Sequence, residues 1–352
     1  MSEDSKQYSD AGLRFIIAAA CLVIVIAGLR AAAEVVLPFL VAVFLAIISV
    51  PLIGWLQRFK VPRAIAVFCT VLLAGGIIGV FGLVVAQSVN GFSVAVPHYQ
   101  DRFQVLLNSV LNLASDLGLP IEEWRSLELL PIGGVFDVLG GALGAVASFA
   151  SNTFLVLLTV IFVLMEAVGF SAKLRAAFGN DANFRQLGEM TRQVQHYLVI
   201  KSAISGLTGV IIGFWATLFG LDFALLWGLI AFILNFIPTL GSIIAAIPAV
   251  LLATIQFGFA EAGLIAVGYL AVNLILGNFL EPTLLGRRLG LSTLVVFVSL
   301  VFWGWVWGPI GMLFSVPLTM AIKIALENTR DLRWVAVMLD ANPSSLPPTT
   351  SD

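Results

Sequence analysis

The stretch NFLEPTLLGRRLG, residues 278–290, places the adjacent basic residues Arg287 and Arg288 between two long apolar runs. Basic residues of membrane proteins collect in the loops on the cytoplasmic side. If the flanking runs lie in a membrane, the side on which these two arginines stand decides how the runs cross it. The position of the two arginines therefore decides the fold.

Composition identifies the class of protein. Apolar residues make up 60% of the chain and charged residues only 11%, which is too few for a water-soluble globule. The apolar residues form unbroken runs of about 18 or more, as in membrane helices, and not the alternating segments of about ten residues that are typical of β-barrels. The net charge of -2 gives no sign of nucleic-acid binding. We expect an all-α, polytopic protein embedded in a lipid bilayer.

The pattern of apolar residues predicts about eight hydrophobic segments. Two of them, 222–257 and 292–326, have about 35 residues each, whereas a helix needs only about 20 to cross a hydrocarbon core of about 30 Å. The other six segments fall at 15–32, 35–56, 64–88, 146–168, 202–220 and 260–280.

Charge separates the hydrophilic segments into two sides. Acidic residues dominate 89–145, whose apolar residues at helical spacing predict an external amphipathic segment. Basic residues dominate 169–201, which we expect to contain a cytoplasmic amphipathic helix. The predicted organisation is a cytoplasmic tail at 1–14, three transmembrane helices at 15–88, the external segment at 89–145, a transmembrane helix at 146–168, the cytoplasmic helix at 169–201, a transport core at 202–326 and a cytoplasmic tail at 327–352.

Two topologies are compatible with the two long runs. With the amino terminus inside, eight straight spans would place Arg287 and Arg288 outside, against the usual bias of basic residues. If 222–257 and 292–326 are instead re-entrant hairpins of broken helices that enter from opposite faces, every basic cluster and both termini are cytoplasmic. We favour the hairpin topology.

Each long run is interrupted near its middle. The first contains NFIPTLGSIIAAIP, residues 235–248, and the second contains WVWGPIGMLFSVP, residues 305–317. In both, a glycine follows a proline by two or three residues; proline removes an amide donor and glycine permits a turn. Non-helical backbone at membrane depth is tolerated only inside protein or beside a polar cavity, so paired breaks point to a transport site. Proline-kinked single spans are the alternative.

Polar groups inside the apolar runs are the candidates for a substrate site, because uncompensated polarity in hydrocarbon is costly. Neutral donors and acceptors would suit a small polyhydroxylated solute, although an interhelical hydrogen bond is the ordinary role of a single Asn or Ser. The candidate substrate-binding residues are Asn235, Pro238, Thr239, Gly241, Ser242, Asn273, Asn278, Glu281, Trp303, Trp307, Gly308, Pro309, Gly311 and Ser315.

Glu281 is the one acidic residue among these candidates. It either couples transport to a proton or cation or pairs with Arg287 or Arg288 at the membrane surface, and we favour the pairing role. The sequence contains no Cys/His cluster, phosphate-binding loop or nucleophile motif. We therefore expect no enzyme activity, no metal and no cofactor.

The sequence LEPTLLGRRLGLSTLVVFVSLVFWGWVWGPIGMLFSVPL, residues 280–318, together with FIPTLGSIIAAIP, residues 236–248, resembles the autoinducer-2 exporter family, also called PerM-like permeases. Many members of that family have a proline where Thr293 stands. The resemblance covers nearly the whole chain and rests on Asn278, Glu281, Pro282, Gly286, Trp303, Trp307, Gly308, Gly311 and Pro317.

This resemblance implies a permease of the bacterial inner membrane that forms a homo-oligomer and moves a hairpin-containing unit in an elevator-like manner. Some relatives are assigned export of the furanone signal autoinducer-2, and others are linked to sodium/proton exchange. The leading hypothesis is a secondary transporter or facilitator of a small polar solute, with export of an autoinducer-2-like signal as the specific expectation. The alternative is a sodium/proton antiporter, in which Glu281 would bind the proton or sodium ion.

Overall fold

The computed structural model describes residues 3–117, 140–141, 144, 156–166, 182–285, 290–327, 329 and 332–341. Every regular element within these ranges is helical. Several predicted features lie outside the described residues: 118–139, 142–143 and 145 of the external segment, 146–155 and 167–168 of the fourth transmembrane helix, 169–181 of the cytoplasmic segment, Arg287 and Arg288, and the tail from 342 onward.

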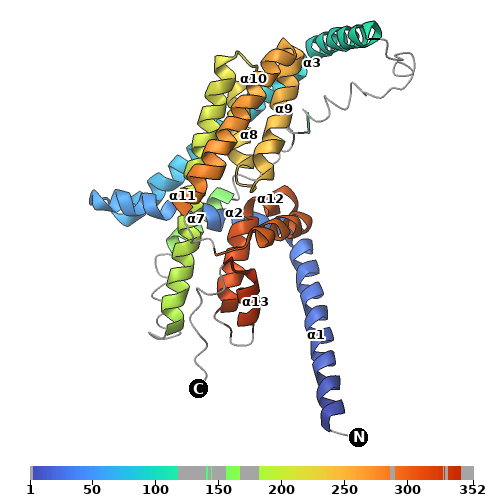
Figure 1. Cartoon of the computed structure of the whole chain (residues 1–352). Coiled ribbons are helices and arrows are strands. Elements are labelled where there is room, and N and C mark those ends of the chain that lie inside the picture. The colour runs from blue at the N-terminus through green and yellow to red at the C-terminus, as the bar shows by residue number, and fades with distance from the viewer. Residues whose placement is uncertain are drawn as a thin grey trace.

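Short connections join α1 to α2, α2 to α3, and the helices from α7 to α11 (Figure 1), whereas between α3 and α7 the structure describes only residues 117, 140–141, 144 and 156–166. Six helical segments are long and apolar enough to cross a membrane, counted over the described part of the chain. Within the predicted runs 15–32 and 146–168, only the shorter apolar helices Ala19–Ala31 and Val156–Glu166 are found in the described residues, so the number eight stays a prediction. The elements are α1 (Glu3–Ala31), α2 (Ala33–Arg58), α3 (Arg63–Asp116), α7 (Ala182–Leu218), α8 (Ala224–Leu234), α9 (Leu240–Phe257), α10 (Phe259–Val272), the π-helix η1 (Asn273–Leu280), α11 (Glu281–Leu285), α12 (Thr293–Glu327) and α13 (Arg333–Leu339).

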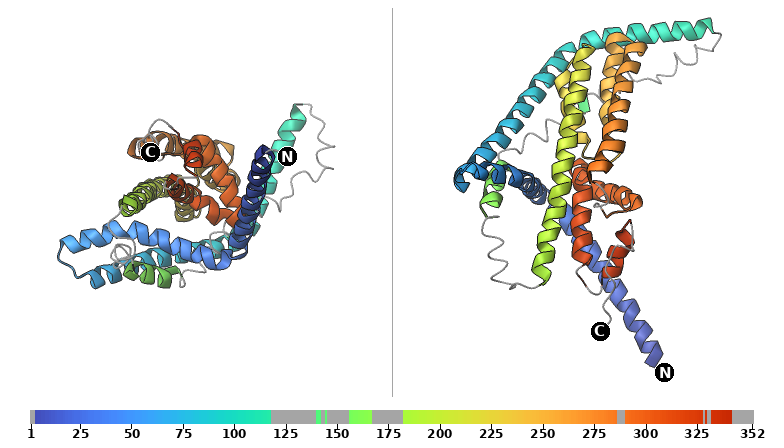
Figure 2. Two further views of the ribbon diagram at one scale, coloured as in Figure 1. Left: turned by 90° about the horizontal axis from the view of Figure 1, so that it is seen from below. Right: turned by 60° about the vertical axis from the view of Figure 1, so that its left-hand side comes forward.

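Helix α3 continues through residue 89, where the external segment is predicted to begin. Figure 2 shows that α3 is bent, and Pro97, which lacks an amide donor, lies inside it. Beyond the proline, the Tyr99 hydroxyl donates a hydrogen bond of 2.7 Å to the carboxylate of Asp222. This contact attaches the far part of α3 to the segment that leads into α8.

The later part of α7 and helices α8, α9 and α10 pack together with residues of α3 in one buried apolar cluster, in the upper half of Figure 1. Glycines allow α7 and α8 to approach closely: a Cβ added to Gly209 would lie 2.7 Å from the carbonyl oxygen of Gly228. Such small-residue contacts are the usual means of close helix packing in membranes. Trp227, Leu252 and Ile265 are buried among these helices. The bundle therefore holds the α8–α9 connection in a fixed frame.

The first long run doubles back on itself. The backbone amide of Asp222 donates to the Gln256 side-chain oxygen at 3.1 Å, although the two residues are 34 positions apart. Helix α8 ends at Leu234, and α9 begins at Leu240 after a turn formed by 235–239. We call α8, α9 and this turn the first helical pair.

The second long run also doubles back, at Gly308, which has a φ of 64° and a ψ of -148° inside α12. The hydroxyls of Ser299 and Thr319 are 2.6 Å apart, yet in a straight helix residues separated by 20 positions would lie about 30 Å apart. The two halves of α12, 293–307 and 309–327, therefore pack against each other, and we call them the second helical pair. That the two pairs enter a bilayer from opposite faces stays a prediction.

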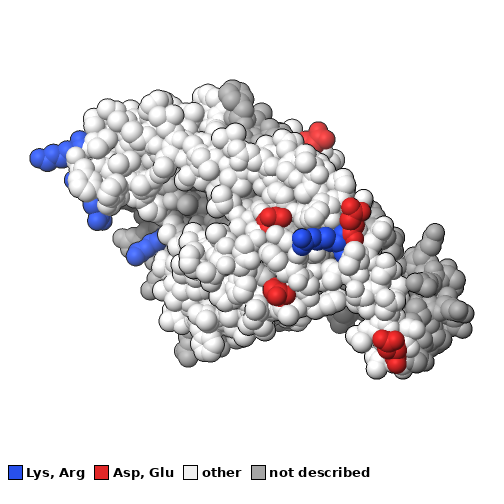
Figure 3. All heavy atoms as spheres, turned by 90° about the horizontal axis from the view of Figure 1, so that it is seen from above, with Lys and Arg blue, Asp and Glu red and all other residues white. Residues whose placement is uncertain are grey.

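The surface carries few charges. Figure 3 shows one face on which the acidic and basic side chains are sparse and the remaining surface is uncharged. Large apolar side chains are exposed along the described helices, among them Phe68 on α3, Phe214 on α7 and Phe279 on η1. A surface of this kind suits contact with lipid rather than water.

Candidate functional site

One face of α7 carries a buried polar stripe. Lys201, Ser205 and Thr208 are separated by four and three residues, so their side chains project from the same side of the helix. All three are buried, which is unusual for polar groups in a helix of this apolar character. The stripe therefore marks a polar interior between α7 and the elements that pack on it.

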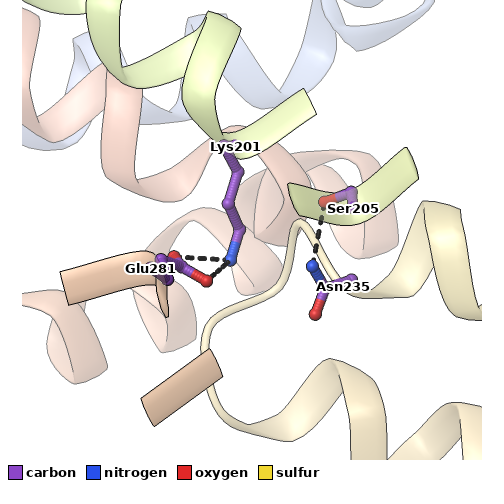
Figure 4. A network of polar contacts seen from close by, with 4 residues as sticks. All are labelled: Lys201, Ser205, Asn235 and Glu281. Carbon is purple, nitrogen blue, oxygen red and sulfur yellow. Dashed lines mark hydrogen bonds and ion pairs between the residues drawn. The ribbon is translucent and has the colours of Figure 1, made fainter. Parts of the chain in front are cut away.

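The turn of the first helical pair meets this stripe at Asn235, which follows the last residue of α8. The Asn235 side-chain amide donates a hydrogen bond of 3.0 Å to the Ser205 hydroxyl, and Asn235 is 8% exposed. Figure 4 shows the two side chains pointing toward each other between α7 and the turn. The side-chain oxygen of Asn235 takes no part in this bond.

The turn itself is held in an unusual backbone conformation. Thr239 has a φ of 60° and a ψ of -47°, which is costly for a β-branched residue. The amide of Leu240 donates to the carbonyl oxygen of Pro238 at 2.6 Å, as in a γ-turn. A Cβ added to Gly241 would collide with the carbonyl oxygen of Leu234, so only glycine fits there. Strained turns of this kind often occur where proteins bind ligands or change conformation.

A cavity of about 10 Å³ lies where the first helical pair faces α7 and η1. That volume corresponds to about one water molecule. Its walls come from five helices and from the turn residue Asn235, and they mix amide and hydroxyl groups with small apolar side chains. The lining residues are Thr208 and Ile212 of α7, Ala231 of α8, Asn235, Ser242 and Ala245 of α9, Tyr269 and Val272 of α10, and Asn273 and Gly277 of η1.

Two hydroxyls in the cavity wall have no hydrogen-bond partner. They belong to Thr208 and Tyr269; with Ser202, they are the buried side-chain polar groups that lack a partner among the described residues. An unpaired buried polar group costs about 1–3 kcal/mol, so native proteins rarely keep one without a role. A solute hydroxyl or a water molecule in the cavity could bond to both groups.

The π-helix η1 supplies another part of the cavity wall. Long π-helical stretches are rare, and short ones occur frequently at functional sites. Asn273 and Gly277 of η1 line the cavity, and a Cβ added to Gly277 would lie 3.0 Å from the Asn273 side-chain oxygen. Asn278, on the same π-helix, is exposed. The two predicted asparagines of this segment therefore have different surroundings.

Glu281 begins α11 directly after η1 and pairs with Lys201 of α7. The Lys201 Nζ atom is 2.7 Å from both carboxylate oxygens, across 80 positions of sequence. Figure 4 shows this pair next to the turn that carries Asn235. Arg287 and Arg288, the partners considered from the sequence, lie outside the described residues.

The second helical pair has its own network of hydrogen bonds, formed by Ser299, Trp303, Trp307, Ser315 and Thr319. The hydroxyl of Ser299 bonds the carbonyl of Ser315, and Trp303 donates to the Thr319 hydroxyl at 3.1 Å. Trp307 donates to the carbonyl of Leu29 in α1 at 3.0 Å. The two tryptophans pack against apolar residues of α1 and α2. This pair is thus attached to the first two helices, away from the residues that line the cavity.

The structure divides the predicted site residues into two groups. Asn235, Ser242 and Asn273 line one cavity, Pro238 and Thr239 lie in the adjoining turn, and Gly241 lies at the start of α9. Glu281 lies beside the turn, and Asn278 is exposed on η1. The residues of the second break are elsewhere in the molecule, within the second helical pair: Trp303, Trp307, Gly308, Pro309, Gly311 and Ser315.

Sequence reasoning missed Thr208, Tyr269 and Lys201. Thr208 and Lys201 could have been found from their spacing with Ser205 on one face of a helix whose other residues are mostly apolar. Tyr269 gave no such signal. Within the described residues, no three His, Cys, Asp or Glu side chains come together as a metal site would require.

Comparison with known proteins adds independent information. The sequence profile of a family described as "AI-2E family transporter" matches residues 19–331. The AI-2 transport protein TqsA of Escherichia coli K12 is 39% identical over 93% of this chain and 96% of its own length. A putative transport protein of Haemophilus influenzae is 35% identical over 93% of the chain and 96% of its own length. The putative transport protein YhhT of Escherichia coli K12 is 33% identical over 96% of the chain and 97% of its own length.

Proposed function

We propose that this chain, which belongs to the AI-2E family of transporters, is an inner-membrane secondary transporter or facilitator that moves a small, uncharged polar solute through the cavity beside the first helical pair. The family and the apolar helices make the chain a multi-pass membrane transport protein. The solute, the site and the movement are the proposal.

The observation that carries the proposal is the pair of unpaired hydroxyls in the cavity wall. Thr208 and Tyr269 are buried, line the same cavity and have no hydrogen-bond partner. Together with the amides of Asn235 and Asn273, they offer donors and acceptors and no net charge. A small molecule with several hydroxyl or carbonyl oxygens matches this lining. Autoinducer-2, the compound named for the relative TqsA, is a candidate of this class.

The size of the cavity supports a transport cycle in which the site opens and closes. A space of about 10 Å³ cannot contain a furanone, so binding requires the surrounding elements to separate. The strained turn at Thr239 and the π-helix η1 are suitable places for such a change. We infer an elevator-like displacement of the unit that contains the first helical pair, within a homo-oligomer.

The topology that fits this cycle has both termini in the cytoplasm and both helical pairs entering the bilayer from opposite faces. Thr283 on α11 is exposed and tests this arrangement. In a variant in which Cys21 and Cys69 are changed to alanine, Thr283→Cys should react with an impermeant thiol reagent only after the cytoplasmic face is opened. Labelling from the outside of intact spheroplasts would contradict the topology.

The antiporter alternative is not supported. It depended on Glu281 as a free carboxylate for a proton or sodium ion, but both oxygens of that carboxylate lie 2.7 Å from the Lys201 ammonium. The close relatives carry the description of transport proteins, and the one with a named solute is an AI-2 transport protein.

Transport of autoinducer-2 by the purified protein in proteoliposomes tests the proposal. Asn273→Ala removes an amide from the cavity wall, and Asn278→Ala removes the same group from the exposed side of η1. We expect Asn273→Ala to lower the transport rate about tenfold, the effect of losing one hydrogen bond of about 1.4 kcal/mol, and Asn278→Ala to retain the wild-type rate.

Equal transport rates for Asn273→Ala and Asn278→Ala would show that the cavity does not lie on the transport path. A wild-type protein that moves no autoinducer-2 at all would refute that solute while leaving the class of neutral polar solutes to be examined.

A further inference from the structure

The proposed solute site does not use the ion pair between Lys201 and Glu281. Lys201 is 3% exposed and Glu281 is 18% exposed. Among the described residues, Lys201 is the only basic side chain that pairs with this carboxylate. The pair therefore places one positive and one negative charge in the interior of a membrane protein, next to the proposed path of the solute.

The geometry of the pair is that of a cation held by a carboxylate. The Nζ atom lies at equal distances of 2.7 Å from the two oxygens, so the ammonium stands in front of the whole carboxylate rather than beside one oxygen. Hard metal cations are likewise bound by carboxylate oxygens. A monovalent cation could therefore take the place of the ammonium in front of this carboxylate. The hydroxyl of Ser205 lies one helical turn along α7, and Figure 4 shows it on the same side of that helix.

The position of the pair links three elements that form the proposed site. Lys201 is on α7, Glu281 follows η1, and the adjacent turn carries Asn235, which bonds Ser205. A carboxylate in such a place needs a compensating positive charge, because an isolated buried charge is very costly. In many transporters that charge comes with a dissociable ion, whereas here it is attached to the protein.

We propose that Lys201 is a tethered replacement for a coupling cation: its ammonium occupies the position beside Glu281 that a sodium ion would otherwise take, so that the protein works without a metal cation. This inference rests on the proposed transport function. Lys201 then determines whether transport is coupled to a cation, since shortening that one side chain would expose a cation site.

The test compares sodium chloride with choline chloride at equal ionic strength, using the purified full-length protein. We expect the melting temperature of the wild type to be the same in both salts. Lys201→Ala should melt about 2–4 °C higher in sodium chloride, because an ion that binds only the folded state stabilises it. Its autoinducer-2 transport should likewise require sodium, while wild-type transport should not.

Two control variants separate a cation site from a general salt effect. Lys201→Arg keeps a tethered cation and should show no preference for sodium. The double variant Lys201→Ala with Glu281→Gln removes the charge that would attract sodium and should lose the preference.

The proposal is overturned by a wild type that depends on sodium, or by a Lys201→Ala protein with the same melting temperature in both salts. It is also overturned if the Lys201→Ala protein folds neither in sodium chloride nor in choline chloride. The melting measurement needs no solute. A sodium effect without autoinducer-2 transport would therefore uphold the cation position and reject only the proposed solute.

Discussion

The two helical pairs share a sequence pattern but differ in how their polar groups are bonded. Both contain a proline followed by a glycine, and both reverse the chain so that distant residues touch. In the first pair, the surrounding cavity has two hydroxyls without partners. In the second, the hydroxyls of Ser299 and Thr319 bond each other, and the indoles of Trp303 and Trp307 bond Thr319 and α1. A helix break alone therefore does not distinguish the two regions, whereas the unpaired hydroxyls do, and on them we base the proposed solute site.

The same contrast appears in the backbone at the two reversals. Gly308 has a φ of 64° and a ψ of -148°, a combination that only glycine adopts readily, whereas the first turn has Thr239 at a φ of 60°. The second reversal is therefore relaxed and the first is strained. We infer that the first pair is the one built to change its shape.

Substitution at the two reversals should have opposite effects on stability, and these are the largest we expect. Gly308→Ala should destabilise the protein by about 3 kcal/mol, because a side chain is not tolerated in that conformation. Thr239→Gly should stabilise it by about 1 kcal/mol, since the relief of strain exceeds the entropy cost of glycine. Thermal unfolding in detergent checks both, and a loss of stability in Thr239→Gly would refute the strain at that turn.

Removing a hydroxyl should distinguish the two polar environments, with a smaller effect. Thr319→Val should cost about 1–3 kcal/mol, because Trp303 loses its acceptor. Thr208→Val is the matched substitution in the first region, where the hydroxyl has no partner. Its melting temperature should equal or exceed that of the wild type. Similar losses in the two variants would show that the hydroxyl of Thr208 is bonded in the folded protein.

Much of the fold was accessible from the sequence because the apolar runs are long and the breaks contain proline and glycine. The all-helical class is confirmed, and the chain reverses next to Pro238 and at Gly308. The number of segments and the entry of the two pairs into a bilayer stay predictions. Neither follows from helix geometry alone, because they depend on where the lipid lies.

The site was accessible only in part, since its residues come from five helices. Asn235, Ser242 and Asn273, which line the cavity, were predicted because a polar group in an apolar run is conspicuous. Glu281 was also found, but its described partner, Lys201, is 80 positions away and had been counted with the cytoplasmic basic residues. From the sequence alone, a basic residue close to Glu281, such as Arg287, is the expected partner of its carboxylate. Packing of α7 on α11 instead brings Lys201 to that carboxylate. Tyr269 resembles an ordinary core aromatic until the cavity is seen.

The most direct test of the central claim is the transport of autoinducer-2 by the double variant Thr208→Val with Tyr269→Phe in proteoliposomes, with its melting temperature measured in parallel. These changes remove only the two unpaired hydroxyls. We predict a transport rate at least about tenfold below the wild type with an unchanged or higher melting temperature. A wild-type rate in this folded variant would contradict the assignment of the cavity as the solute site.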